Sequence, residues 1–170
     1  MSISLYDVTV ASYRRMIRGS IAVLAKGEAH CQEQGLDPDT LVECRLVDDM
    51  LPLHYQVTSV AHHSLGALQA LESGVFEPPP KGPELNYSGL SQVLVNTGEA
   101  LAQLTPEGVN GCADRPLVFK LGDREIPYEA TDFMLSFSLP NFYFHATTLY
   151  DILRQQGVPV GKLDYLDMSL

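Results

Sequence analysis

The sequence lacks the features that mark several large classes of protein. No run of about 18 apolar residues occurs, so the sequence predicts no membrane-spanning helix. The segment from Met1 to Asp7 has neither the basic region nor the apolar run of a secretory signal, and we expect a cytoplasmic protein. A Gly-rich phosphate loop, a GxSxG elbow and an HExxH helix are also absent. The three cysteines form no CxxC pair and are odd in number, which favours free thiols over a disulfide framework.

Positive charge is scarce. Eleven Lys and Arg residues stand against 21 Asp and Glu residues, which gives a net charge of −10. A chain this acidic repels phosphate backbones, and the sequence therefore argues against nucleic-acid binding. The densest basic group, Arg14, Arg15 and Arg18, is typical of the solvated face of a helix.

The composition is that of an ordinary globular protein. The chain has 170 residues, of which 45% are hydrophobic and 19% charged. This length fits one domain and allows a sizeable core, so we expect residues 1–170 to form a single domain.

Hydrophobic residues recur at helical spacing along most of the chain. A capping pair, Ser4 and Asp7, and a terminating Gly35 predict a first helix from Leu5 to Gln34. The other expected helices are a short one over Asp39–Leu46, a long one from Asp48–Asp49 to Gly74, a third over Ser88–Leu104, and a last one over Pro140–Gln156 with an earlier turn from Asp132 as an option.

The pattern changes ahead of the last helix. Residues 117–121 and 124–128 flank Gly122-Asp123, which predicts a small β-hairpin with a two-residue turn and, because of Pro127, an edge strand. Helices joined by short connections favour antiparallel neighbours, so the expected fold is a mainly α bundle carrying this hairpin. The segment Gly161–Tyr165 is expected to be pinned to the bundle.

Histidines are the most informative candidates for a site. A helix advances about 100° per residue, and with Val57 at the centre of the second long helix's buried stripe, His54 falls on the shoulder of that stripe and His63 further round, in the row of Gln56. His62 is expected to be exposed. His145 falls in the middle of the last helix's stripe. His145 and His54 could therefore face one another and begin a divalent-metal site, whereas the alternative for each is a histidine that is simply hydrogen-bonded or partly exposed.

Four further residues are candidates for lining a pocket beside His145. They are Asn141, Gln56, Asp49 and Tyr13. Asp49 lies one turn before Leu53, although a carboxylate at a helix start also has a role in stabilising the helix dipole. Pockets between the helices of a bundle are common binding places for small organic ligands.

Two motifs carry a resemblance that covers nearly the whole chain. The first is Leu139-Pro-Asn-Phe-Tyr-Phe-His145, continuing through Gly161-Lys162-x-Asp164-Tyr165; the second is Arg45-Leu46-x-x-Asp49-Met50-x-x-Leu53-x-x-Gln56. With them the chain resembles an uncharacterised bacterial family related to the DinB/YfiT-like metalloenzymes. The resemblance implies a four-helix bundle of up-down-down-up order. It also implies a divalent metal held by three histidines, one of them on helix two and two of them four residues apart on helix four, and thiol-dependent S-transferase, hydrolase or isomerase chemistry.

The chain departs from that pattern at one position. The partner of His145 would be residue 141 or 149, and these are Asn141 and Leu149, so the three-histidine set is incomplete. The second long helix could still supply His54 or, as the second choice, His63. Three functions stay open. The first is an enzyme with zinc, nickel or manganese held by His145, His54 and Asn141 or Asp49. The second, which we favour, is a small-ligand-binding protein or degenerate metalloenzyme without metal. The third is a homodimeric interaction module built on the aromatic run Phe142–Phe144. Whether any reaction is catalysed is left open.

Overall fold

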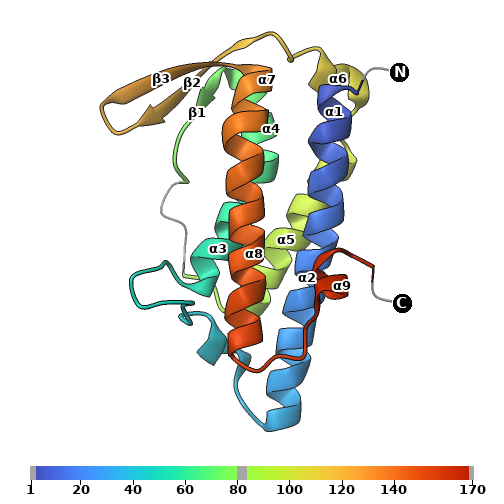
Figure 1. Cartoon of the computed structure of the whole chain (residues 1–170), viewed down its shortest axis with the longest axis vertical. Helices are drawn as coiled ribbons and strands as arrows, with labels where there is room; N and C mark the ends of the chain where they lie inside the picture. Colours follow the sequence, from blue (N-terminus) through green and yellow to red (C-terminus); the bar gives the residue numbers. More distant parts are fainter. Residues whose placement is uncertain (1–2, 80–83, 169–170) are drawn as a thin grey trace.

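The computed structural model describes residues 3–79 and 84–168, which form a mainly helical protein with one small sheet (Figure 1). The longer helices are α2 (Val10–Gln34), α3 (Leu53–Ala61), α5 (Tyr87–Ala102) and α8 (Leu139–Gln155). The shorter helical segments are α1 (Leu5–Val8), the 3₁₀ turn η1 (Pro38–Leu41), the π-helical turn η2 (His62–Gly66), α4 (Ala67–Ser73), α6 (Pro106–Asn110), α7 (Ala130–Asp132), the π-helical turn η3 (Phe133–Ser138) and α9 (Lys162–Tyr165). The strands are β1 (Val75–Phe76), β2 (Pro116–Leu121) and β3 (Arg124–Glu129).

The long helices pack side by side around a common core (Figure 1). α2 contacts α5 and α8, and α3 contacts the same two helices. Side chains from all four, among them Ile17, Val57, Leu94 and Leu149, are fully buried between them. Within the described residues, no helix is long and apolar enough to cross a membrane.

The first helical run largely follows its prediction. Ser4 and Asp7 form the expected capping box, in which the Ser4 side chain accepts from the Asp7 amide and the Asp7 carboxylate accepts from the Ser4 amide. Gly35 ends the run in the left-handed conformation, at φ 68°. The run is divided at Thr9, whose hydroxyl donates to the carbonyl of Leu5.

The second long helix starts later than predicted. It begins at Leu53 rather than at Asp48–Asp49, because Pro52 is extended (ψ 175°) and a proline disfavours helical backbone in the residue before it. The short helix expected over Asp39–Leu46 is reduced to the 3₁₀ turn η1, capped by Asp37. The sequence prediction was therefore wrong about the segment between Leu41 and Leu53, which is a loop.

The predicted hairpin is confirmed. β2 and β3 pair antiparallel around Gly122, which has a φ of 60°, and Pro127 lies on an edge strand opposite Val118. The two-residue strand β1 was not predicted. It follows Gly74, pairs parallel with β2, and brings Phe76 beside Phe119.

The last helical run is longer than predicted and irregular. It starts at Ala130, ten residues before Pro140, and continues through η3 into α8. Proline has no amide hydrogen to donate within a helix, and π-helical turns are one recognised way to absorb such a gap in the hydrogen-bond ladder. Pro140 was predicted to start the helix, but it lies inside the helical run.

The C-terminal segment is pinned to α2 through α9. The Lys26 ammonium lies 2.7 Å from the buried Asp164 carboxylate, which also accepts from the Gly161 amide. Gly19 is the point of closest approach, since a Cβ atom there would clash with the carbonyl oxygen of Tyr165.

Replacing Gly19 with alanine should therefore separate α9 from α2. The obstacle is backbone, which cannot rotate away, and we expect a loss of about 1–3 kcal/mol in the free energy of unfolding. Gly98→Ala is the matched control. Gly98 also lies inside a helix, α5, but a Cβ atom there would meet the side chain of Ile17 and no backbone atom. Urea unfolding measures both variants. Equal stability of the two would contradict the close contact between α9 and α2.

Candidate functional site

His145 lies in the buried stripe of α8, as predicted, with 9% of its surface exposed. Its Nδ1 is 2.8 Å from the Gln56 side-chain oxygen Oε1, which reaches it from α3. Gln56 is itself buried, so this hydrogen bond joins two facing helices inside the protein.

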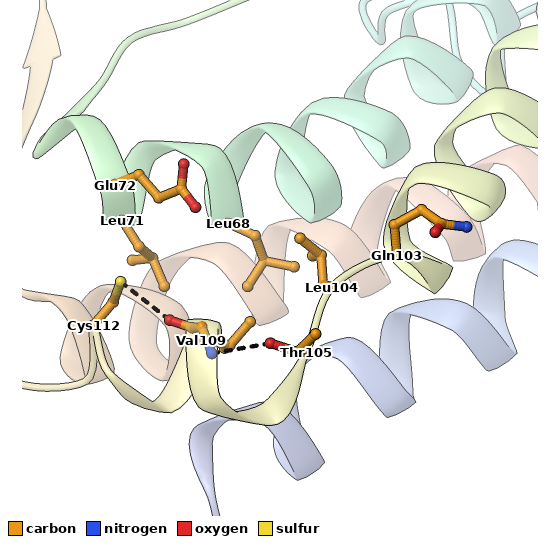
Figure 2. A pocket seen from close by; sticks show the side chains of 9 residues that line it. Leu68, Leu71, Glu72, Gln103, Leu104, Thr105, Val109 and Cys112 are labelled. Atoms are coloured by element: carbon orange, nitrogen blue, oxygen red, sulfur yellow. Dashed lines mark hydrogen bonds between the residues drawn. The ribbon is translucent and has the colours of Figure 1, made fainter.

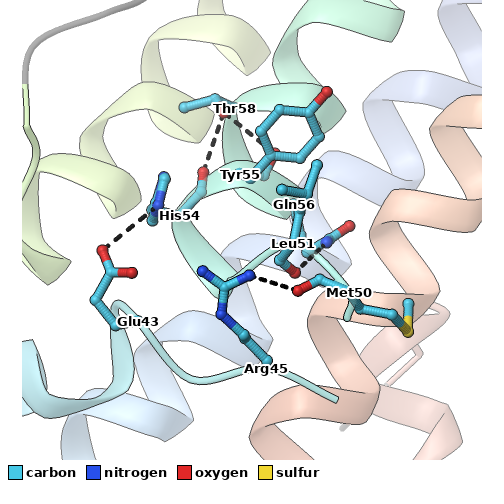
Figure 3. Close-up of polar contacts among 8 residues, drawn as sticks. All are labelled: Glu43, Arg45, Met50, Leu51, His54, Tyr55, Gln56 and Thr58. Carbon is cyan, nitrogen blue, oxygen red and sulfur yellow. Dashed lines mark hydrogen bonds and ion pairs between the residues drawn. The ribbon is translucent and has the colours of Figure 1, made fainter. Parts of the chain in front are cut away.

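The orientation of the Gln56 amide fixes the proton on His145. Gln56 Nε2 donates to the Leu51 carbonyl at 2.7 Å (Figure 3), and a carbonyl can only accept. Oε1 therefore faces His145 and accepts from it, so Nδ1 carries the proton. The neutral ring then has a lone pair on Nε2 that is available to a ligand.

The loop before α3 holds the Leu51 carbonyl in place. Arg45 Nη1 donates to the Met50 carbonyl at 2.6 Å (Figure 3), and the Leu53 amide donates to the Cys44 carbonyl at 2.9 Å. The motif from Arg45 to Gln56 therefore forms a chain of contacts that ends at His145.

His63 is the second histidine of the site, and the sequence analysis had given it less weight than His54. Its ring stacks on that of His145, with centroids 5.4 Å apart and an interplanar angle of 14°. His63 lies near the start of the π-helical turn η2. The projection at about 100° per residue placed His63 in the row of Gln56, and both side chains do lie against His145.

His54 does not share these contacts. Its side chain is 40% exposed, and Nε2 lies 3.5 Å from Glu43 Oε1 (Figure 3). His54 and Gln56 are two residues apart, about 200° round the helix, so one points away from α8 when the other points toward it. The ring contacts of His145 are with Tyr55, His63 and Phe144.

The remaining sequence candidates divide into two groups. Asp49 is exposed in the turn before Pro52, and Asn141 donates to the Phe137 carbonyl of its own helical run at 2.8 Å. Tyr13 is buried and reaches the site indirectly, through the hydroxyl of Ser138 at 2.7 Å.

Ser138 connects the two π-helical turns. Its hydroxyl donates to the His63 carbonyl at 2.6 Å, and since a serine has a single hydroxyl proton, Tyr13 must donate to Ser138. These two hydrogen bonds tie α2, η3 and η2 together directly beneath His63. Ser138 was not selected from the sequence, because helical periodicity gives no signal for a π turn.

Burial keeps both imidazoles neutral. It lowers the pKa of His145 to about 4. It also lowers the pKa of His63 to about 3, with the neighbouring rings of His145 and His62 adding to the effect. The rings of Phe76 and Phe137 lie against His63 and make its surroundings apolar.

One atom of the site lacks a hydrogen bond within the described residues. His63 Nδ1 is buried and has no partner there. Leaving a buried polar atom unpaired costs about 1–3 kcal/mol, and such atoms are uncommon in folded proteins. The site therefore offers two neutral imidazole edges, one at His63 Nδ1 and one at His145 Nε2.

Comparison with known proteins identifies the chain's relatives but assigns no activity. A family model described as a domain of unknown function (DUF1993) matches residues 5–166. A crystal structure of a DinB family member protein from Shewanella denitrificans is 28% identical, with a TM-score of 0.79, and the match covers 95% of this chain and 91% of that chain. Nothing among curated proteins matches.

The metal that a DinB relationship implies does not fit the residues present. Residues 3–79 and 84–168 contain no group of three or more His, Cys, Asp or Glu side chains that could hold a metal ion. His63 and His145 supply two imidazoles, whereas catalytic zinc sites use three protein ligands. The amide of Asn141 is a poor substitute for a borderline metal.

His63→Leu tests the electrostatic description of the site. Unfolded histidine has a pKa of about 6.5, so between pH 6.5 and about 4 the unfolded chain binds protons that the buried rings do not. The free energy of unfolding should fall with decreasing pH, by about 1.4 kcal/mol per pH unit for each buried histidine.

The leucine variant lacks the pH-dependent contribution of His63 and its unpaired Nδ1 atom. We expect a shallower slope and, at pH 7, a gain of about 1 kcal/mol. Urea unfolding at pH 7, 6 and 5 measures both, and an unchanged slope would contradict the description.

Proposed function

The chain belongs to the DUF1993 family of domains of unknown function, and from its site we propose that this member binds a small organic ligand on the His63–His145 pair. The observation that carries the proposal is the unpaired His63 Nδ1 beside a His145 ring whose Nε2 is left free by the Gln56 hydrogen bond. An unpaired buried atom is a stability cost that a bound hydrogen-bonding group would remove.

The surroundings indicate the chemistry of the ligand. Aromatic rings of Tyr55, Phe137 and Phe144 lie within 6.0 Å of one or other imidazole, measured between ring centroids. The imidazoles themselves are neutral at pH 7, so the site has no cation to neutralise an acid group. A neutral ligand with an apolar or aromatic frame and a group that donates or accepts a hydrogen bond fits best.

The bundle architecture supports this location. The site joins α3 to α8, and ligand sites between facing helices are common in bundles. We place these helices in the up-down-down-up order implied by the DinB relationship. In that setting the protein is a degenerate relative of metal-binding bundles, in which His145 has kept its place and the further histidine of its helix has been replaced by Asn141 or Leu149.

The two other functions considered have less support. A metal-dependent S-transferase or hydrolase needs a third ligand, which the described residues do not provide. The homodimer stays a prediction. Of the aromatic run, Phe142 packs on Tyr13 in the core, whereas Tyr143 and Phe144 are 37% and 55% exposed and are the residues available to a second copy.

A comparison of His145→Phe with His54→Phe tests the proposal. Phenol and benzamide serve as probes, since each combines an aromatic frame with a neutral hydrogen-bonding group. We expect both to raise the melting temperature of the wild-type protein, and their affinity to fall about tenfold in His145→Phe through loss of one hydrogen bond. His54→Phe should bind the probes like wild type, because His54 faces Glu43 instead.

Two results would contradict the proposal. If His145→Phe only stabilises the protein and no probe distinguishes it from wild type, His145 is a packing residue. If zinc, nickel or manganese binds at one ion per chain and this binding is lost in His145→Phe, the site is a metal site instead.

A further inference from the structure

A separate cavity lies between α4, the end of α5 and α6 (Figure 2). Its volume is about 200 Å³, and none of the residues of the imidazole site lines it. An apolar cavity of about 150 Å³ is already large enough to hold benzene. The space therefore suits a small organic molecule, and it is distinct from the site of the proposed function.

The inner wall of the cavity is apolar. Leu68 and Leu71 approach from α4 and Val109 from α6, and all three are at least nine-tenths buried (Figure 2). The Cys112 thiol completes this wall, with its Sγ donating to the Gly108 carbonyl at 3.4 Å (Figure 2). Since that weak donor is already used, the wall presents no strong hydrogen-bonding group to a ligand.

The rim of the cavity carries charge of one sign. Glu72 is the charged residue among those that line it, and the polar side chains of Gln103 and Thr105 belong to the same lining (Figure 2). Within the part of the chain that the structure describes, no Lys, Arg or His forms an ion pair with Glu72. Thr105 is engaged, because its hydroxyl accepts from the Gly108 amide at 3.2 Å. The carboxylate is therefore available to a positively charged group.

We infer that this cavity binds a small primary amine, with its hydrocarbon part between Leu68, Leu71 and Val109 and its ammonium group on Glu72. The apolar wall gains from burial of the hydrocarbon part, and the carboxylate supplies the complementary charge. A carboxylic acid of the same size would place its negative charge beside Glu72, in a chain of net charge −10. A bare metal ion would make no use of the apolar wall.

Butylamine, butan-1-ol and butyrate at pH 7 are the probes, because they share a four-carbon chain and differ in charge. Amide chemical shifts of the intact protein report binding and its location. We expect butylamine to shift amides of α4 and α6, with an affinity about twofold to fivefold above that of butan-1-ol, as a solvent-exposed ion pair allows. Butyrate should bind more weakly than either.

Two variants and a control place the interaction. Glu72→Gln should reduce the affinity for butylamine to that for butan-1-ol, whereas Glu33→Gln, an exposed glutamate on α2, should leave the difference intact. Leu104→Phe, at the half-buried edge of the cavity, should weaken both probes. The inference is overturned if butylamine binds no better than butan-1-ol, if Glu72→Gln preserves the difference, or if neither probe shifts these amides. His145→Phe leaves amine binding unchanged, so failure here is separable from failure of the proposed function.

Discussion

The hydrogen bond between Gln56 and His145 is the constraint on which the site depends. It holds α3 against α8 at a buried point, and its direction follows from the second bond that Gln56 makes to the Leu51 carbonyl. Because that carbonyl can only accept, a loop of the main chain determines which nitrogen of His145 carries a proton. The same arrangement, a fixed partner on one nitrogen and a lone pair on the other, orients histidines that bind metals. In this protein the arrangement orients His145, whose neighbouring imidazole is that of His63.

The second imidazole lies where two π-helical turns meet. His63 of η2 stacks on His145, and Ser138 of η3 donates to the His63 carbonyl, with Tyr13 behind it. π-helical turns are frequent at functional sites, and here two from different helical runs meet at one point. The unpaired His63 Nδ1 beside them is the atom that the proposed ligand would satisfy.

The sequence predicted the features that local chemistry determines. Gly35 and Gly122 take the left-handed backbone expected of them, and His145 is buried because its neighbours in the stripe are apolar. The family resemblance was confirmed as well. His63 was ranked below His54, although the projection placed it in the row of Gln56, and β1 was missed because two residues carry no pattern. The cavity beside Glu72 could not be foreseen, since its walls come from α4 and from the segment 103–112, which are apart in the chain and meet only in the fold.

The imidazole rings themselves give the most direct test of the central claim. Nitrogen-15 correlation spectra at pH 7 and pH 5 report the charge and tautomer of each histidine. The account predicts that His63 and His145 are predominantly neutral at both pH values, and that His145 carries its proton on Nδ1 with Nε2 bare. A cationic His145 at pH 5, or a proton on Nε2 with Nδ1 bare, would contradict it.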